Sequence, residues 1–348
     1  MAKKNKSVTW SLLLNAFIFI GLMGLTLWFV FKDQDLNQVL RVMGSANPFF
    51  LILGVLCMLG YFSMEAWNVQ TLLNSFGEKV SFFNALKYTS IGFFFCSVTP
   101  GASGGQPLEI YYMAKEGIST ANATLSILIQ TCGVQFAVTG LGLICAILGN
   151  DFLSGQVAIL FAIGLVINVF ALIVLLLCIF FTGGLKSILR HFFGFLWRHG
   201  FKKADSWLQK AEAGLDKYNE GSRYIRTHKK EFWTSIAKVV GQMSFYYLIP
   251  FFVYLSFGLT KETVFSIFTM QSILFVATCC LPIPGAIGAS EAVFLTLYGT
   301  VFGESMVSSA MLLNRGISFY FFVLVTMVIV FINIITKGRM RFGHKRKK

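Results

Sequence analysis

Eight apolar segments follow one another along the chain, and polar stretches separate them. They cover approximately residues 10–31, 49–73, 82–98, 119–149, 155–181, 232–257, 264–282 and 305–336. A helix needs roughly 20 apolar residues to cross the hydrocarbon core of a bilayer, and the full-length segments meet this requirement. No charged residue occurs between Asp151 and Lys186, or between Arg315 and Lys337. The pattern predicts an all-α integral membrane protein.

The composition excludes the water-soluble classes of protein. Of the 348 residues, 56% are hydrophobic and only 13% are charged, whereas soluble domains carry about 25% charged residues. A soluble enzyme, a secreted disulfide scaffold and a disordered protein are therefore excluded. The apolar run 10–31 follows a basic N-terminus, as in a signal peptide, but about 22 residues is too long for that signal's apolar region. We expect a first transmembrane helix there.

The net charge of +14 is concentrated in three blocks. Three Lys lie within residues 1–6, eleven Lys and Arg within 183–231, and seven within 337–348. Basic loops stay on the cytoplasmic side of a membrane, so all three blocks and both termini are expected there. Five crossings before the 183–231 loop would place it outside. The conflict disappears if residues 82–115 form a re-entrant hairpin from the cytoplasm and residues 264–301 form a second one from the outside. About six full crossings and two hairpins result.

A short internal repeat agrees with this topology. Residues 96–104 align without gaps on residues 280–288, and they share a Cys, the run Pro-Gly-Ala and a Gly. Inverted repeats with broken helices near the middle of the membrane are typical of transporters. We expect two repeat units, 49–149 and 232–336, within one polytopic membrane domain that spans residues 1–348.

The basic loop 183–231 is expected to lie on the cytoplasmic leaflet as an amphipathic helix. Its apolar residues recur at helical spacing: Trp207, Leu208, Ala211, Leu215 and Tyr218. Because membrane topology already explains the basic blocks, no nucleic-acid partner is expected.

The two hairpin tips carry the strongest chemical signal. Pro100 and Pro284 would stop the incoming helices, because proline lacks an N–H group and clashes with the preceding turn. Glycines permit tight turns after them: Gly101, Gly104, Gly105, Gly285 and Gly288. New half-helices would begin near Gly104 and near Ser290, which can cap the second one. Their free N–H groups favour anions. Two ordinary proline kinks are the alternative.

Five ionisable residues lie inside apolar segments: Glu65, Lys87, Glu109, Glu291 and Arg315. Charges within a membrane are costly, so each is a candidate for function. Glu109 and Glu291 follow the two Pro-Gly-Ala turns and should lie close to a cavity between the tips. Arg315, with Tyr320, can face Glu291, and a purely structural Glu–Arg pair is the alternative. Lys87 can reach the cytoplasmic surface, and the position of Glu65 is ambiguous.

Several kinds of chemistry have no sequence support. The chain contains neither a phosphate-binding loop, nor a Gly-x-Ser-x-Gly turn, nor a His-Glu-x-x-His helix. All four His lie in the basic segments, and the seven Cys form no Cys-x-x-Cys pair. We therefore expect no catalytic residues, no metal site and no cofactor.

Two motifs resemble the lysylphosphatidylglycerol synthase transmembrane family, which includes the flippase half of the multiple peptide resistance factor. The first is Thr99–Pro107 with Tyr111–Met113 after it, and the second is Leu281–Glu291 with Arg315–Ser318 after it. The resemblance covers nearly the whole chain. It implies an eight-segment lipid flippase of the bacterial plasma membrane, a link to antibiotic resistance, and motif positions for Pro100, Gly101, Gly104, Gly105, Pro284, Gly285, Gly288, Glu291 and Arg315.

The sequence departs from the family pattern in two places. Fused members continue into a soluble aminoacyltransferase domain, whereas we expect no such domain here. Many relatives carry Glu-Arg in the helix after the first hairpin, where this chain has Gln130-Thr131 and Gln135.

These observations favour a lipid translocase over an enzyme. Its partners would be anionic or lysyl-modified phospholipids. Arg315 and the half-helix N-termini would bind the phosphate, and Glu109 or Glu291 would bind a lysyl ammonium group. Two alternatives stay open: a phosphatidylglycerol lysyltransferase that acts with a separate aminoacyltransferase, and a carrier of polyprenyl-phosphate-linked glycolipids. Formation of an oligomer is also open.

Overall fold

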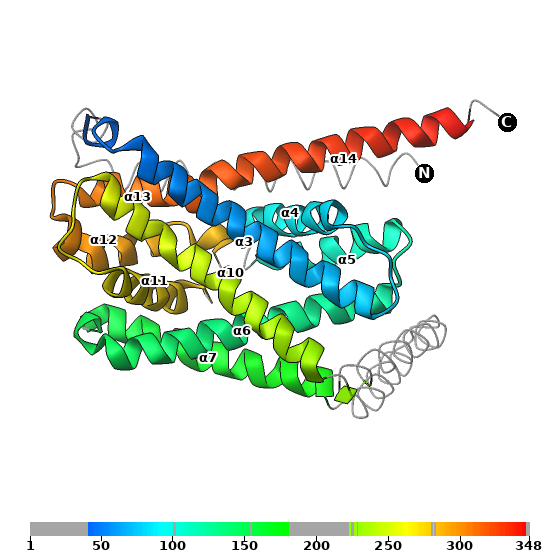
Figure 1. Cartoon of the computed structure of the whole chain (residues 1–348), viewed down its shortest axis with the longest axis horizontal. Helices are drawn as coiled ribbons and strands as arrows, with labels where there is room; N and C mark the ends of the chain where they lie inside the picture. The colour runs from blue at the N-terminus through cyan, green and yellow to red at the C-terminus, as the bar shows by residue number, and fades with distance from the viewer. Residues whose placement is uncertain are drawn as a thin grey trace, which may run out of the picture.

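The computed structural model is built from helices packed side by side (Figure 1). It describes residues 41–99, 102–153, 155–180, 223, 226, 227, 229–279, 281 and 283–345. The α-helices are α3 (Pro48–Ser75), α4 (Phe82–Val98), α5 (Gly105–Lys115), α6 (Thr120–Leu148), α7 (Gly155–Phe180), α10 (Lys229–Ser256), α11 (Val264–Thr278), α12 (Ala289–Phe302), α13 (Val307–Arg315) and α14 (Phe321–Lys345). No strand occurs in these ranges.

Five helical stretches are long and apolar enough to cross a membrane. They are α3, α6, residues 155–177 of α7, α10, and the continuous stretch 307–333 that contains α13 and the first half of α14. This confirms the expected all-α membrane protein. The sixth expected crossing, over 10–31, and most of the basic loop 183–231 lie outside the described residues.

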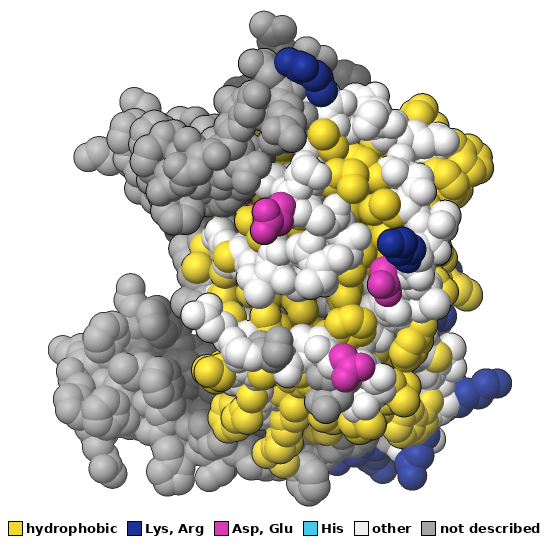
Figure 2. Space-filling model, turned by 90° about the vertical axis from the view of Figure 1, so that its left-hand side faces the viewer, with side chains coloured by type: hydrophobic (Ala, Val, Ile, Leu, Met, Phe, Trp, Pro, Cys, Tyr) yellow, Lys and Arg dark blue, Asp and Glu magenta, His cyan; other side chains and the backbone are white. Residues whose placement is uncertain are grey.

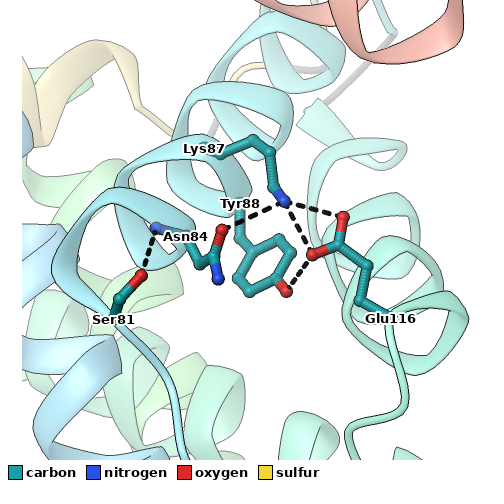
Figure 3. A network of polar contacts seen from close by, with 5 residues as sticks. All are labelled: Ser81, Asn84, Lys87, Tyr88 and Glu116. Atoms are coloured by element: carbon teal, nitrogen blue, oxygen red, sulfur yellow. Dashed lines mark hydrogen bonds and ion pairs between the residues drawn. The ribbon is translucent and has the colours of Figure 1, made fainter. Parts of the chain in front are cut away.

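The first expected hairpin is formed by α4 and α5. At its base, Lys87 Nζ lies 2.6 Å from a carboxylate oxygen of Glu116, which also accepts a 2.5 Å hydrogen bond from the Tyr88 hydroxyl (Figure 3). The start of α4 and the residue after α5 therefore meet at one end of the bundle. Glu78, in the loop after α3, accepts hydrogen bonds from Ser119 N and Asn122 Nδ2 at the start of α6. The chain thus leaves this hairpin at the end where it entered.

The second hairpin consists of α11, a short 3-10 helix (Pro284–Ala286) and α12. The Tyr298 hydroxyl on α12 donates to the carbonyl of Ile267 on α11 at 3.3 Å. The Phe302 ring, at the end of α12, packs against Tyr254 and Phe257 at the end of α10. This hairpin therefore enters from the other end of the bundle, and Figure 1 shows the α11–α12 and α4–α5 pairs in opposite halves of the molecule.

Helices α3 and α10 run side by side along the bundle and connect the two hairpins (Figure 1). On α3, Phe62 packs against Phe93 of α4 and stacks on Phe322 of α14, with ring centroids 5.0 and 5.2 Å apart. One buried aromatic side chain thus joins three helices. The last crossing contains a π-helical turn, Gly316–Tyr320, directly after Arg315. Such turns are rare and often mark functional sites.

Candidate functional site

The tip of the second hairpin turns through left-handed backbone. Gly285 has φ +59° and Gly288 has φ +89°, conformations that a residue with a Cβ rarely adopts. Gly288 is the N-cap of α12, and its N–H donates to Glu291 Oε2 at 2.7 Å. Ser290 is the second residue of α12 and donates to the same oxygen at 2.9 Å. The start of α12 is therefore two residues earlier than expected, and the carboxylate of Glu291, rather than Ser290, caps it.

Arg315 fixes this tip to the last crossing. Its Nε donates to Glu291 Oε1 at 2.8 Å, and its Nη2 donates to the carbonyl of Gly285 at 2.8 Å. The Tyr320 hydroxyl donates to Glu291 Oε1 at 3.3 Å. The guanidinium lies over the Phe319 ring, with Cζ 4.7 Å from the ring centroid. Arg315 and Tyr320 thus face Glu291, as expected.

Both oxygens of Glu291 have protein donors, because Oε1 pairs with Arg315 and Tyr320 while Oε2 caps α12. Glu291 is 1% exposed and Arg315 is 7% exposed. A Glu–Arg pair therefore forms and holds the broken backbone in place, which is the structural role that the sequence left open as an alternative. Direct contact of Glu291 with a cationic headgroup stays a prediction.

The first tip is held by Thr99, a residue that sequence reasoning did not select. Its hydroxyl accepts a 2.9 Å hydrogen bond from the N–H of Gly104, the N-cap of α5, and its carbonyl accepts one from Ala102. The half-helix thus begins where the sequence predicts. Pro100 and Gly101 lie outside the described residues.

Close approach of α4 and α5 depends on Gly105. A Cβ at this position would overlap Cys96 Sγ and lie 2.6 Å from the carbonyl oxygen of Gly92. A Cβ on Gly92 would in turn lie 2.6 Å from Glu109 Oε2. Gly92 therefore makes room for the Glu109 carboxylate, and only the fold identifies this role.

Two cavities that share part of their walls lie between the hairpins. The tip cavity, of about 220 Å³, is lined by Cys96 and Ala102 of the first tip, by Gly285 and Ser290 of the second, and by Arg315. The carboxylate cavity, of about 300 Å³, is lined by Glu65, Glu109 and polar side chains of α6 and α10. Both are lined by Phe93, Cys96, Phe275 and Cys279. One cavity thus lies at the broken backbone, and a neighbouring one lies at a pair of carboxylates.

The carboxylate cavity contains the residues that depart from the family pattern, since Gln130, Thr131 and Gln135 all line it. Glu65, whose position was ambiguous from the sequence, faces the same cavity. Lys87 lies away from it, at the base of the first hairpin, where it pairs with Glu116.

A buried chain of amides leads to Glu65. Gln242 Nε2 donates to Glu65 Oε2 at 3.0 Å, Gln130 Nε2 donates to Gln242 Oε1 at 2.9 Å, and Asn68 Nδ2 donates to Gln130 Oε1. Polar residues at such depth are a functional signal by themselves. The position of Asn68 and Gln242 inside apolar segments would have identified them as candidate site residues. Among the described residues, no group of three His, Cys, Asp or Glu is arranged to hold a metal ion.

Five helical stretches long enough to cross a membrane, together with two opposed hairpins, define a multi-pass helical membrane protein. Residues 12–326 match the family described as the lysylphosphatidylglycerol synthase TM region. Because the match covers most of the chain, the protein belongs to this family of lipid-related flippases and synthases.

A curated relative is a UPF0104 membrane protein of Archaeoglobus fulgidus, to which the chain is 26% identical over 101 residues. The matched stretch covers 29% of this chain and 31% of that relative. The chain thus matches about a third of the relative's length, and this similarity supports membership of a membrane-protein family.

Proposed function

We propose that the protein is a lipid translocase that moves an anionic or aminoacylated phospholipid between the leaflets of the cell membrane. The observation that carries this proposal is the pair of neighbouring cavities between the hairpins, one lined by Arg315 and the other by two carboxylates. Non-helical backbone at membrane depth is tolerated where it is buried in protein or lines a wet cavity. A headgroup would occupy these cavities, and the acyl chains would stay in the bilayer.

The two cavities suit the two parts of such a headgroup. Arg315 lines the tip cavity, and a guanidinium has five N–H donors, so it can bind phosphate while it stays paired with Glu291. Glu65 and Glu109 line the other cavity and would receive an ammonium group. Glu291 already balances the charge of Arg315, so we assign the ammonium to Glu109 rather than to Glu291.

The experiment that tests this function measures leaflet exchange in liposomes. Vesicles of phosphatidylcholine and phosphatidylglycerol would contain the purified chain and fluorescent lysylphosphatidylglycerol, and a membrane-impermeant quencher would report the fraction in the outer leaflet. We expect exchange well above that of empty vesicles. Glu109→Gln should slow exchange at least about tenfold, since a hydrogen bond to a charged group contributes roughly 1.5–3 kcal/mol.

Glu304→Gln is the matched control, because Glu304 is an exposed carboxylate in the loop after α12. It should exchange lipid at the parent rate. Exchange no faster than in empty vesicles would contradict the proposed function. Faster exchange of a labelled polyprenyl phosphate than of either phospholipid would instead favour a glycolipid carrier.

We further propose that the bundle end shown in Figure 2 faces outward. The loops after α6, α10 and α12 carry Asp151, Lys261, Glu262 and Glu304, and Figure 2 shows acidic side chains on this end. The basic residues Lys229 and Lys230 begin α10 at the other end. The positive-inside rule then places the basic loop and both termini in the cytoplasm.

Labelling of introduced cysteines tests this orientation. In intact cells, an impermeant maleimide should label Glu304→Cys and leave Lys79→Cys unlabelled until the cells are opened. The parent chain, whose described cysteines lie within or at the ends of apolar helices, provides the blank. The reverse labelling pattern would mean that the protein is inserted the other way round.

A further inference from the structure

The carboxylate cavity has two acids and no basic partner. Its lining residues include Glu65 on α3 and Glu109 on α5, and none of them is Lys, Arg or His. The other ionisable groups that face it are Tyr61 on α3, Cys96 on α4 and Cys279 after α11. Both carboxylates line the same cavity, and two ionised carboxylates that share a site repel each other. Each ionised carboxylate in such a place is costly unless a cation accompanies it.

Two hydrogen-bond acceptors in this cavity lack a donor. Glu109 is 4% exposed, and its Oε1 has no hydrogen-bond partner. The side-chain carbonyl oxygen of Gln135, on α6, is buried and also without a partner. Buried polar atoms are normally satisfied. Both missing partners are donors, so the group that completes this cavity brings N–H or O–H bonds and positive charge.

The amide chain makes Glu65 the anionic member of the pair. Asn68, Gln130 and Gln242 each donate an N–H toward the next acceptor, and the series ends on the Glu65 carboxylate. Aligned donors stabilise a negative charge at the end of the chain, whereas side-chain amides carry no charge that could neutralise it. Glu109 has no donor at Oε1, so its carboxylate is the less stabilised anion of the two.

We propose that Glu65 and Glu109 form a monovalent-cation site at which a proton and the ammonium group of a lipid displace each other. This inference rests on the proposed function for the source of the ammonium group. The protonated Glu109 carboxyl gives up its proton as R–NH₃⁺ enters, so that COOH and R–NH₃⁺ become a COO⁻···⁺H₃N–R pair and one released H⁺. The ammonium keeps its three N–H bonds, which can satisfy Glu109 Oε1 and Gln135 Oε1, and total charge is conserved.

Calorimetry of the full chain in detergent tests this site directly. The purified protein would be titrated with n-octylammonium chloride at pH 7 in two buffers of different ionisation enthalpy, which gives the number of protons released. We expect about one proton per ammonium bound, as two interacting carboxyls share one proton. Glu109→Gln should abolish proton release, and Glu65→Gln should weaken binding at least about tenfold. Glu304→Gln, the control, should behave as the parent.

Folding is checked with Glu109→Asp, which keeps a carboxyl group and should retain proton release. Binding of octylammonium without proton release in the parent, or with equal affinity in Glu109→Gln, would overturn the proposal. So would saturable binding of sodium chloride that octylammonium does not displace.

The cation site and the translocase function can be contradicted independently of each other. If proton release is present but vesicles show no lipid exchange, the cation site stands and the proposed function fails. If lipid exchange proceeds equally at pH 5.5 and pH 8 and no proton is released, the function stands and the cation site fails.

Discussion

Replacing Arg315 with Met should lower the free energy of unfolding by about 3–5 kcal/mol, the usual cost of leaving one member of a buried ion pair alone. The guanidinium contacts both the Glu291 carboxylate and the carbonyl of Gly285, so its loss leaves a buried anion and frees the turn. Unfolding in mixed detergent micelles, followed by helical circular dichroism, would measure the loss.

The double variant Glu291→Gln/Arg315→Met distinguishes the effect of an unpaired charge on stability from the effect of the changed side-chain shape. It removes the unpaired anion, and it should recover much of the stability that Arg315→Met loses. If the double variant is as unstable as the single one, pairing with Glu291 is not what makes Arg315 important. Lipid exchange measured on the folded fraction would then show whether Arg315 also contacts substrate.

Replacing Gly105 with Ala should destabilise the first hairpin by about 1–3 kcal/mol, the range for overfilling a well-packed site. The added Cβ would overlap Cys96 Sγ and crowd the backbone carbonyl of Gly92. Because the carbonyl cannot rotate away, α4 and α5 must separate. The thermal midpoint of the purified protein would report the change.

Gly140→Ala on α6 is the control for this substitution, since a Cβ there meets nothing within 4 Å. Alanine is also the better helix former, so stability should stay equal or rise. Adding Cys96→Ala to Gly105→Ala should recover part of the loss. An unchanged midpoint in Gly105→Ala alone would refute the close-packing role.

The sequence predicted the hairpins because two independent patterns agreed. The distribution of Lys and Arg required the segments 82–115 and 264–301 to return to the side they left, and the repeated Pro-Gly-Ala run occurred in those segments. The pairing of Arg315 with Glu291 was also predictable, because charged side chains within a membrane usually pair with one another. The cap of α12 could not be predicted from the sequence, because Gly288 contributes only a backbone N–H to it.

By itself, the sequence determined the class of protein, its helical segments and the positions of the broken helices, since these follow from local apolarity, charge and proline. Only the tertiary structure decided how the carboxylates are used. Glu291 pairs with Arg315 and caps α12. Glu109 and Glu65 instead line one cavity together with side-chain amides from α6 and α10. Contacts between residues more than a hundred positions apart, such as Gln130 with Gln242, depend on helix packing that no local pattern specifies.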